Sequence, residues 1–337
     1  MLASRMLFTQ PGLTLAAMLL WLLLPPWGHA SETLRIATFN IAWLADEPLS
    51  AAMISQCRAE ARAYPDMAHR PTPACRSGLF RSAAAYSELA RQVARLDADI
   101  IAFQEVQSAR ALAAILADGR YQQPGTWQWW VNPLPVNARQ RVALAVRSSR
   151  LGTLQLHALP ELGRPLWREQ RGGLLARLTL ASGRILHLLV VHLKSGCRDG
   201  ELDSTMACRQ LAAQGRILAR IIDQEQESGA PLVILGDFNR DFANEQALWS
   251  QLDNQQPRGA RLQRLTQGFQ QPDGCYLPRY GADPIDHILL SGPLLDHAVP
   301  GSLGTSPLSP DTDRATAKAR GALLSDHCPL RVDLRWP

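Results

Sequence analysis

Several runs of this chain are apolar at every position for four consecutive residues, and they constrain the fold more than any other feature. The clearest are residues 188–191 (LLVV) and 232–235 (LVIL). A strand with one face in water alternates apolar and polar residues, so an unbroken run predicts a strand that is covered on both faces. Such strands need helices or a second sheet around them. We therefore predict a layered α/β sandwich.

Further segments extend this pattern along the chain. Strands are predicted at residues 34–43, 100–106, 141–147, 174–180, 185–193 and 232–237, and helices at residues 82–96 and 203–227. In the second helix, Leu211, Leu218 and Ile222 fall on one apolar stripe that suits packing on a sheet. Residues 297–313, rich in Pro, Gly and Ser, are predicted to be a surface loop.

The first thirty residues have the pattern of a secretory signal peptide. Arg5 precedes the apolar residues 13–24, and small residues follow up to Ala30. A transmembrane anchor would need about 20 apolar residues, more than this stretch offers. We predict a leader at residues 1–30, one domain at residues 31–337, and a periplasmic or secreted protein without stable membrane insertion after cleavage.

The six cysteines are predicted to form disulfides, because an exported chain meets an oxidising compartment. Pairing by proximity in the sequence gives Cys57 with Cys75, Cys197 with Cys208, and Cys275 with Cys328. The alternative, a zinc site, is not supported because the chain has no Cys-x-x-Cys spacing. Residues 46–81 contain the first pair, and we interpret them as an insertion that forms a disulfide-closed flap beside Asn40.

Polar residues follow several of the predicted strands. Asn40 and Glu105 come at the ends of apolar runs, where a sheet delivers side chains to a cleft at its edge. Their hard oxygen ligands suit Mg²⁺ or Mn²⁺, although either residue alone is also typical of a strand-end turn. The formal charge of +5 falls to +4 when Arg5 is removed, which suits a polyanionic substrate without requiring one.

The segment Gly236-Asp237-Phe238-Asn239 follows a fully apolar strand. Glycine allows a tight turn, and the side chains of Asp237 and Asn239, two residues apart, face the same side. Asp237 can take a proton from water, and Asn239 can hold the attacking oxygen or a phosphate oxygen. The alternative is an ordinary Asx-turn.

Two Asp-His dipeptides lie near the C-terminus, at Asp286-His287 and Asp326-His327. An aspartate that orients a histidine from another strand fixes its tautomer and raises its basicity, and we pair Asp286 with His327 on this basis. The apolar neighbours of His287 favour a packing role. A serine-hydrolase site is not supported, because the chain has no Gly-x-Ser-x-Gly elbow.

Taken in order, these motifs resemble those of the endonuclease/exonuclease/phosphatase superfamily over essentially all of residues 31–337. They are Thr38-Phe39-Asn40, Gln104-Glu105, His192-Leu193-Lys194-Ser195, Gly236-Asp237-Phe238-Asn239, Asp286-His287 and Ser325-Asp326-His327. The resemblance implies a four-layered α/β sandwich with two packed mixed β-sheets. It also implies a divalent-metal phosphoesterase site at the edge of the sheets.

The resemblance assigns a role to each motif. Asn40 and Glu105 would hold Mg²⁺, with Mn²⁺ or Ca²⁺ as alternatives, and Asp326 would lie near the metal. Asp237 would position or deprotonate the attacking water, and Asn239 would orient it. This in-line displacement needs no covalent enzyme intermediate.

The phosphate contacts follow from the same resemblance. His192 and His327, the latter held by Asp286, would contact the scissile phosphate and share the proton transfers. Arg164 and Lys194 would bind the substrate phosphate. The chain departs from the deoxyribonucleases at residues 139–141 (RQR), because they carry a glutamate there that orients the first histidine. The sequence therefore does not define what orients His192.

Three classes of function fit these motifs. The leading one is an exported, monomeric, divalent-metal-dependent endonuclease that hydrolyses DNA, with RNA as a further candidate. The alternatives are a phosphatase or phosphodiesterase acting on phospholipid or inositol phosphate head groups, and a binding protein that has lost catalysis. Trp127 and Trp129 lie on one face of a predicted strand, where they could stack on nucleobases or pack as core aromatics.

Overall fold

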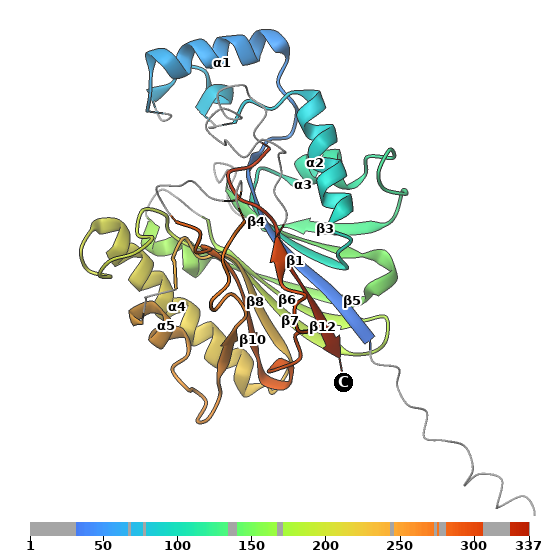
Figure 1. The fold of residues 1–337 in the computed structure, drawn as a ribbon, viewed down its shortest axis with the longest axis vertical. Helices are drawn as coiled ribbons and strands as arrows, with labels where there is room; N and C mark the ends of the chain where they lie inside the picture. The colour runs from blue at the N-terminus through green and yellow to red at the C-terminus, as the bar shows by residue number, and fades with distance from the viewer. Residues whose placement is uncertain are drawn as a thin grey trace, which may run out of the picture.

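The computed structural model describes residues 32–66, 69–76, 79–133, 140–166, 171–242, 246–272, 275, 281–305 and 324–336 (Figure 1). The predicted leader at residues 1–30 lies outside the described residues, as do residues 306–313 of the predicted loop. Within the described residues, no helix combines the length and apolarity that a membrane crossing requires.

Twelve strands form two mixed sheets of six strands each. The first has the order β11 (Gly304–Thr305), β12 (Leu330–Trp336), β1 (Glu32–Leu44), β2 (Ile100–Val106), β4 (Arg141–Arg147) and β3 (Trp127–Val131). The second has the order β5 (Leu151–Leu159), β6 (Gly173–Leu180), β7 (Ile185–His192), β8 (Leu232–Asp237), β10 (Asp286–Ser291) and β9 (Leu262–Arg264). The pairs β1/β2 and β7/β8 are parallel.

Helices cover the outer faces of both sheets. The α-helices are α1 (Ala51–Ala63), α2 (Ala83–Arg95), α3 (Ala109–Leu116), α4 (Met206–Glu227) and α5 (Ala247–Leu252). One apolar cluster fills the space between the sheets, a second joins the first sheet to α2 and α3, and a third joins the second sheet to α4 and α5. The four-layered α/β sandwich predicted from the sequence is confirmed.

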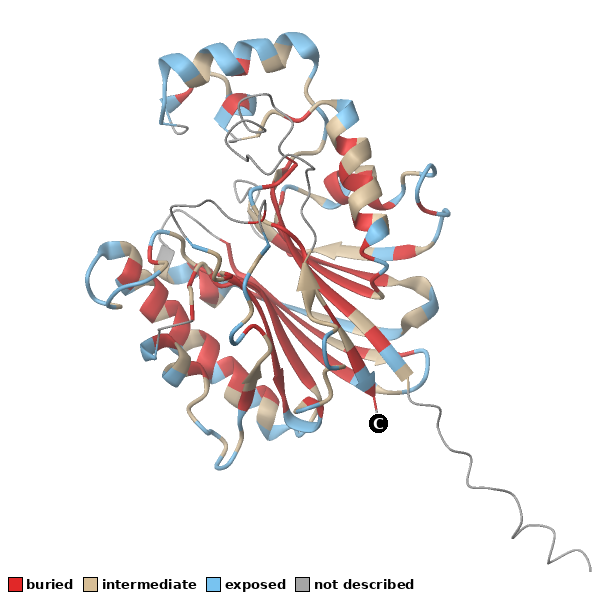
Figure 2. Ribbon diagram, in the orientation of Figure 1, coloured by how far each residue is buried: buried red, intermediate tan, exposed pale blue. Residues whose placement is uncertain are grey.

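The unbroken apolar runs owe their composition to this layering. In β7, Leu188 and Val190 pack between the sheets, whereas Leu189 and Val191 pack under the helices. Strand β8 divides its four apolar residues in the same way. Since neither face of these strands meets water along residues 188–191 and 232–235, neither face carries polar residues there (Figure 2).

The predicted helices begin where a side chain caps them. Ser82 accepts a hydrogen bond from the N–H of Ala85, so α2 begins at Ala83, close to the predicted start. Helix α4 begins at Met206, three residues later than the predicted start at residue 203. The reason is that the Thr205 side chain accepts from the N–H of Cys208 and takes the cap position.

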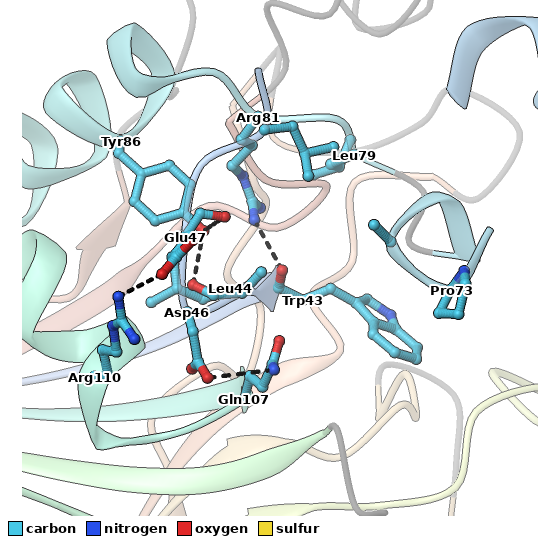
Figure 3. Close-up of a pocket in the computed structure, with 13 residues that line it drawn as sticks. Trp43, Leu44, Asp46, Glu47, Pro73, Leu79, Arg81, Tyr86, Gln107 and Arg110 are labelled. Carbon is cyan, nitrogen blue, oxygen red and sulfur yellow. Dashed lines mark hydrogen bonds and ion pairs between the residues drawn. The ribbon is translucent and has the colours of Figure 1, made fainter. Parts of the chain in front are cut away.

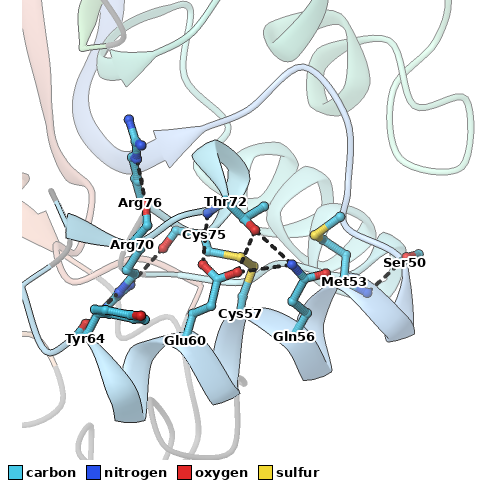
Figure 4. The surroundings of a disulfide bond; sticks show 10 residues. All are labelled: Ser50, Met53, Gln56, Cys57, Glu60, Tyr64, Arg70, Thr72, Cys75 and Arg76. Atoms are coloured by element: carbon cyan, nitrogen blue, oxygen red, sulfur yellow. Dashed lines mark hydrogen bonds between the residues drawn. A yellow bond between two sulfur atoms is a disulfide. The ribbon is translucent and has the colours of Figure 1, made fainter.

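All three disulfides are present with the predicted pairing: Cys57–Cys75, Cys197–Cys208 and Cys275–Cys328. Disulfides of this number are typical of proteins in an oxidising compartment. The first joins α1 to the short 3₁₀ helix η2 (Pro73–Arg76), as Figure 4 shows. The described residues of the segment 49–81 thereby form a lobe, whose base is closed by a hydrogen bond from the Leu49 N–H to the Arg81 carbonyl.

Helix α1 in this lobe was not predicted from the sequence. Only Cys57 is buried along it, and Figure 2 shows the helix largely exposed and projecting away from the sheets. The lobe is held by polar contacts instead: Thr72 donates through both its N–H and its hydroxyl to the carboxylate of Glu60. A helix held in this way carries no apolar stripe for the sequence to display.

The tryptophans of β3 pack in the core. Trp127 is buried and Trp129 packs against the same cluster as α2 and α3, while Trp130 packs between the sheets. The indole N–H of Trp129 donates to the carbonyl of Ala109 at 3.1 Å. The structure therefore supports the core alternative for Trp127 and Trp129 over stacking on nucleobases.

Helix α4 is anchored to its sheet by a buried carboxylate. Glu225 accepts from the Arg177 guanidinium of β6 at 2.6 Å and lies 2.6 Å from Nδ1 of His187 on β7. Burial acts to raise the pKa of Glu225, but the hydrogen bonds from His187 and Arg177 outweigh it and lower the pKa from 4.5 to about 2. The ionised form is therefore favoured by folding, and its contribution to stability is complete above pH 4.5.

We predict that replacing the Glu225 carboxylate lowers stability by an amount that depends on pH. Glu225→Gln should lower the free energy of unfolding at pH 7 by about 2 kcal/mol. The difference from the wild type should shrink as the pH falls from about 4.5 to about 2, because the wild type loses the same interaction by protonation. Urea denaturation across this range measures it, with Glu227→Gln, an exposed residue of the same helix, as the control. A constant difference across this range would contradict the assignment.

Candidate active site

Three adjacent strands of the second sheet carry ionisable residues at one edge, and these residues face one side. Strand register places Asp237 at the end of β8 opposite His192 of β7 and opposite Asp286 of β10. Residues in register on neighbouring strands point to the same face of a sheet. The three side chains, far apart in the sequence, therefore form one row.

The first sheet contributes through a disruption of its regular pairing. Residues 41–43 of β1 lie opposite the single residue 105 of β2, and Ala42, Trp43 and Glu105 have φ angles of 49°, 55° and 63°. Left-handed backbone is uncommon outside glycine, and bulges of this kind redirect side chains next to functional sites. Asn40, just before the bulge, donates from Nδ2 to Oδ2 of Asp237 at 2.9 Å. This bond joins the two sheets at the site.

Asp237 lies at the centre of the cluster and is buried. Asn239 donates its N–H to Oδ1 at 2.7 Å and its side-chain amide to Oδ2 at 3.0 Å. Nε2 of His192 lies 3.5 Å from Oδ2, and Nε2 of His327 lies 3.9 Å from it. Burial raises the pKa of Asp237, with the neighbouring His327 and Asn40 opposing the shift. A carboxylate with a raised pKa is suited to accept a proton near neutral pH.

Glu105 faces the same space from the first sheet. One carboxylate oxygen accepts the N–H of Trp43 at 3.1 Å, and the other lies 3.7 Å from Nε2 of His192. Burial and the negative charge of Asp326 raise the pKa of Glu105. The site thus gathers several carboxylates whose charges repel one another at short range.

His327 is paired with Asp286 as the sequence predicted. The ring nitrogen Nδ1 of His327 lies 2.6 Å from Oδ2 of Asp286. The backbone N–H of His327 donates to the hydroxyl oxygen of Ser325, and that hydroxyl donates to the carbonyl of Asn40. Burial lowers the pKa of His327, but the charges of Asp286 and Asp237 outweigh it and hold the pKa well above its ordinary value. His327 is therefore charged near neutral pH and can give up a proton.

Sequence reasoning missed Arg171, the residue that contacts His192. Its Nη1 lies 2.8 Å from Nε2 of His192 and donates to the carbonyl of Leu193 at 2.7 Å. Arg171 is only 5% exposed. Burial and the charge of Arg171 hold the pKa of His192 well below its ordinary value, so this imidazole is neutral. The one available signal was an arginine directly before the glycine pair that begins β6.

The two predicted phosphate-binding residues, Lys194 and Arg164, are placed differently relative to the rest of the predicted site. The loop of Lys194 is held at the site by α4, since Gln214 accepts the N–H of Lys194 at 2.8 Å and donates to the carbonyl of Leu162 at 2.7 Å. Arg164 is exposed on the 3₁₀ helix η4 (Pro160–Leu166). Among the described residues, the structure records no contact between Arg164 and the rest of the predicted site. His287, in contrast, is buried and hydrogen-bonded to Thr266 and to the carbonyl of Arg240, as a packing role requires.

A pocket of about 460 Å³ opens over the part of the cluster that contains His327. Asn239, Asp286, Asp326 and His327 line it, together with the loop that carries Ser195 and Arg198. The disulfide partner of Cys328, Cys275, forms part of its wall. Substrate in this pocket would meet the proton-carrying histidine directly.

The donor set fits a hard divalent cation. Asp237, Asp286 and His327 offer ligand atoms within 4.8 Å of one another and could hold a metal ion. The predicted set of Asn40, Glu105 and Asp326 adds an amide and two carboxylates beside them. Burial and neighbouring negative charges raise the pKa of Asp237 and of Glu105, so a cation would stabilise their ionised forms, and oxygen donors select Mg²⁺, Mn²⁺ or Ca²⁺ over softer metals.

Comparison with known proteins agrees with this geometry. A profile of the Endonuclease/Exonuclease/phosphatase family matches residues 37–327, which include every residue of the predicted site. The chain belongs to this family. No curated protein sequence matches the chain significantly.

Solved structures share the fold of the family at low sequence identity. ANGEL2, a 2′,3′-cyclic phosphatase in complex with adenosine-2′,3′-vanadate, aligns with a TM-score of 0.53 and 17% identity over 91% of this chain and 96% of its own. Truncated TDP2 from Caenorhabditis elegans gives 0.52 and 14% over 90% and 97%. A family protein from Bacteroides vulgatus gives 0.51 and 14% over 91% and 100%. These likenesses establish the fold.

We predict that the position directly before Asp237, Gly236, tolerates only glycine. Gly236 has φ of 144°, and a Cβ there would lie 2.0 Å from the carbonyl oxygen of Val191. Gly236→Ala should lower the free energy of unfolding by about 3 kcal/mol or more, because the β7/β8 pairing must move. Gly183→Ala is the control: φ is 84°, but no atom lies within 4 Å, so only the conformational cost of about 1 kcal/mol applies. Thermal or urea unfolding compares them, and equal losses would contradict the steric argument.

Proposed function

We propose that this member of the family is an exported, Mg²⁺-dependent nuclease that hydrolyses phosphodiester bonds of DNA, with RNA as a further candidate. The observation that carries the proposal is the position of Asp237 between two histidines of opposite character. His327 is charged and held by Asp286, whereas His192 is neutral and held by Arg171. A phosphodiester hydrolase needs a base for water, an acid for the leaving oxygen and positive charge at the phosphate, and this cluster offers all three.

Each residue then has a defined task. Asp237 accepts a proton from the attacking water, which the side chain of Asn239 orients. His327 gives its proton to the leaving oxygen, and Asp286 keeps that imidazole in position. Arg171 donates hydrogen bonds to phosphate oxygens as negative charge develops, and the neutral His192, which accepts from Arg171 through Nε2, holds that guanidinium in place. A divalent cation bound by Asn40, Glu105 and Asp326 would supply further positive charge at the phosphate.

The surface favours nucleic acid over lipid head groups. A membrane-bound substrate calls for a contiguous apolar patch, but the exposed large apolar side chains of the described residues are scattered. They are Tyr64 after α1, Tyr121 after α3, Ile185 at the start of β7 and Met206 at the start of α4. ANGEL2, which shares the fold, is a 2′,3′-cyclic phosphatase in complex with adenosine-2′,3′-vanadate, and this supports a substrate of the nucleotide class here. The three disulfides support an oxidising location, periplasmic or secreted.

The direct test is nicking of supercoiled plasmid by the purified protein. Mg²⁺ should support cutting and EDTA should abolish it. Asp237→Asn keeps the size of the side chain but removes the base, so the rate should fall at least about 10²-fold. The matched control is Asp97→Asn, which changes an exposed aspartate whose φ of 48° asparagine tolerates, and it should cut like the wild type. Intact plasmid with folded wild-type protein would refute the proposal and favour phospholipid or inositol phosphate substrates.

A second prediction concerns the pH dependence that Asp286 imposes. The charge of Asp286 raises the pKa of His327, so Asp286→Asn should lower that pKa. The acid form of His327 would then be lost earlier as the pH rises, and the alkaline limb of the pH–rate profile should move to lower pH. Cleavage rates at saturating substrate across pH 5–10 measure this shift, beside His327→Ala as the variant that lacks the group. An alkaline limb that does not move would show that His327 is not the acid.

A further inference from the structure

A second pocket of about 460 Å³ lies at the end of β1, around Trp43 and Leu44 (Figure 3). Its walls come from the end of β1, the start of α2 and the lobe of residues 49–81. The lining residues are Trp43, Leu44, Ala45, Asp46, Glu47, Leu49, Pro73, Ala74, Leu79, Arg81, Tyr86, Gln107 and Arg110. None of them belongs to the site predicted from the sequence.

Trp43 joins this pocket to the catalytic cluster. Its backbone N–H donates to Glu105 at 3.1 Å, while Figure 3 shows its indole directed toward Pro73 of the lobe. Trp43 follows Ala42 in left-handed backbone, and such strain persists only where the surroundings fix it. Arg81 fixes it here, because its guanidinium donates to the carbonyls of Ile41 and Trp43. The bulge that presents Asn40 to Asp237 therefore also presents the Trp43 indole to the pocket.

The chemistry of the pocket selects one class of occupant. A free phosphate would meet the carboxylates of Asp46 and Glu47, while the cations are engaged: Arg81 with backbone carbonyls and Arg110 with Glu47. An acyl chain would have to desolvate the same two carboxylates. A planar ring with polar edge groups fits instead, with its face on the indole and its edge toward Asp46 and Gln107, whose amide donates to the Asp46 carboxylate at 3.4 Å.

We infer that this pocket binds a nucleobase of the substrate strand on the Glu105 side of the scissile phosphate, stacked on Trp43. The inference rests on the proposed nuclease function. The lobe then has a role: Leu49, Pro73, Ala74 and Leu79 close the wall opposite the body of the protein. The Cys57–Cys75 disulfide holds the segment that carries Pro73 and Ala74 in place.

The experiment compares binding of two oligonucleotides of the same length, one with bases and one fully abasic, to protein carrying Asp237→Asn so that neither is cut. Fluorescence anisotropy in Mg²⁺ gives the ratio of the two dissociation constants. Trp43→Leu should reduce this ratio about tenfold, because base–aromatic stacking is lost, and Trp43→Phe should retain most of it. Ala74→Leu fills the pocket from the exposed side of the lobe and should reduce the ratio without touching the core. Tyr121→Leu, an exposed aromatic on another element, should leave the ratio unchanged.

The outcomes separate this inference from the proposed function. A ratio that falls in Trp43→Leu and Ala74→Leu supports the pocket, even where the wild type fails to nick plasmid and the nuclease proposal is lost. An unchanged ratio in both folded variants overturns the pocket, even where plasmid is cut. Equal binding of the two oligonucleotides by the parent protein, or no binding of either, also overturns it.

Discussion

Burial of the Asp237 carboxylate is the constraint around which the site is organised. A buried charge is costly unless hydrogen-bond donors surround it, and the donors here come from both sheets. Asn40 reaches Asp237 from the first sheet, and Asn239 wraps back from the end of the second. The bulges in β1 and β2 and the close approach of β8 to β7 at Gly236 are what these contacts require of the backbone. The two sheets are therefore held together at this edge by polar contacts, whereas elsewhere they pack through apolar side chains.

The disulfides reinforce the loops that the sheets alone do not fix. Cys197 follows the His192 motif and is tied to Cys208 at the start of α4, while Cys328 directly follows His327 and is tied to Cys275. Loops at a sheet edge have few apolar contacts and open locally at low free-energy cost. A covalent link beside each histidine limits that opening. The disulfides thus contribute to the geometry of the site as well as to overall stability.

The sequence could predict the strands and most of the cluster because each polar residue stands close to the end or the start of an apolar run. Asp237 ends β8, Asp286 begins the antiparallel β10 and Asn40 lies near the end of β1, so all three are brought to one edge of the sheets. Arg171 could not be predicted in this way, since its partner His192 lies 21 residues further on and the two meet only through the packing of loops beside β6 and β7. Trp43 was also missed as a pocket residue. Its direction depends on two successive left-handed residues, which no alternation of apolar and polar positions reveals.

At residues 139–141 the chain lacks the glutamate that the deoxyribonucleases carry, and Arg171 contacts His192 instead. A carboxylate beside His192 would raise the pKa of that imidazole, and both histidines of the site would then favour the charged form. Burial and the guanidinium in contact with His192 have the opposite effect and outweigh the nearby carboxylates of Asp237 and Glu105, so one histidine is neutral and the other charged within the same cluster. Groups whose environments push their pKa values apart can act as different partners in one reaction. Arg171 therefore leaves proton donation to His327 alone and places its own fixed charge where phosphate oxygens would gather.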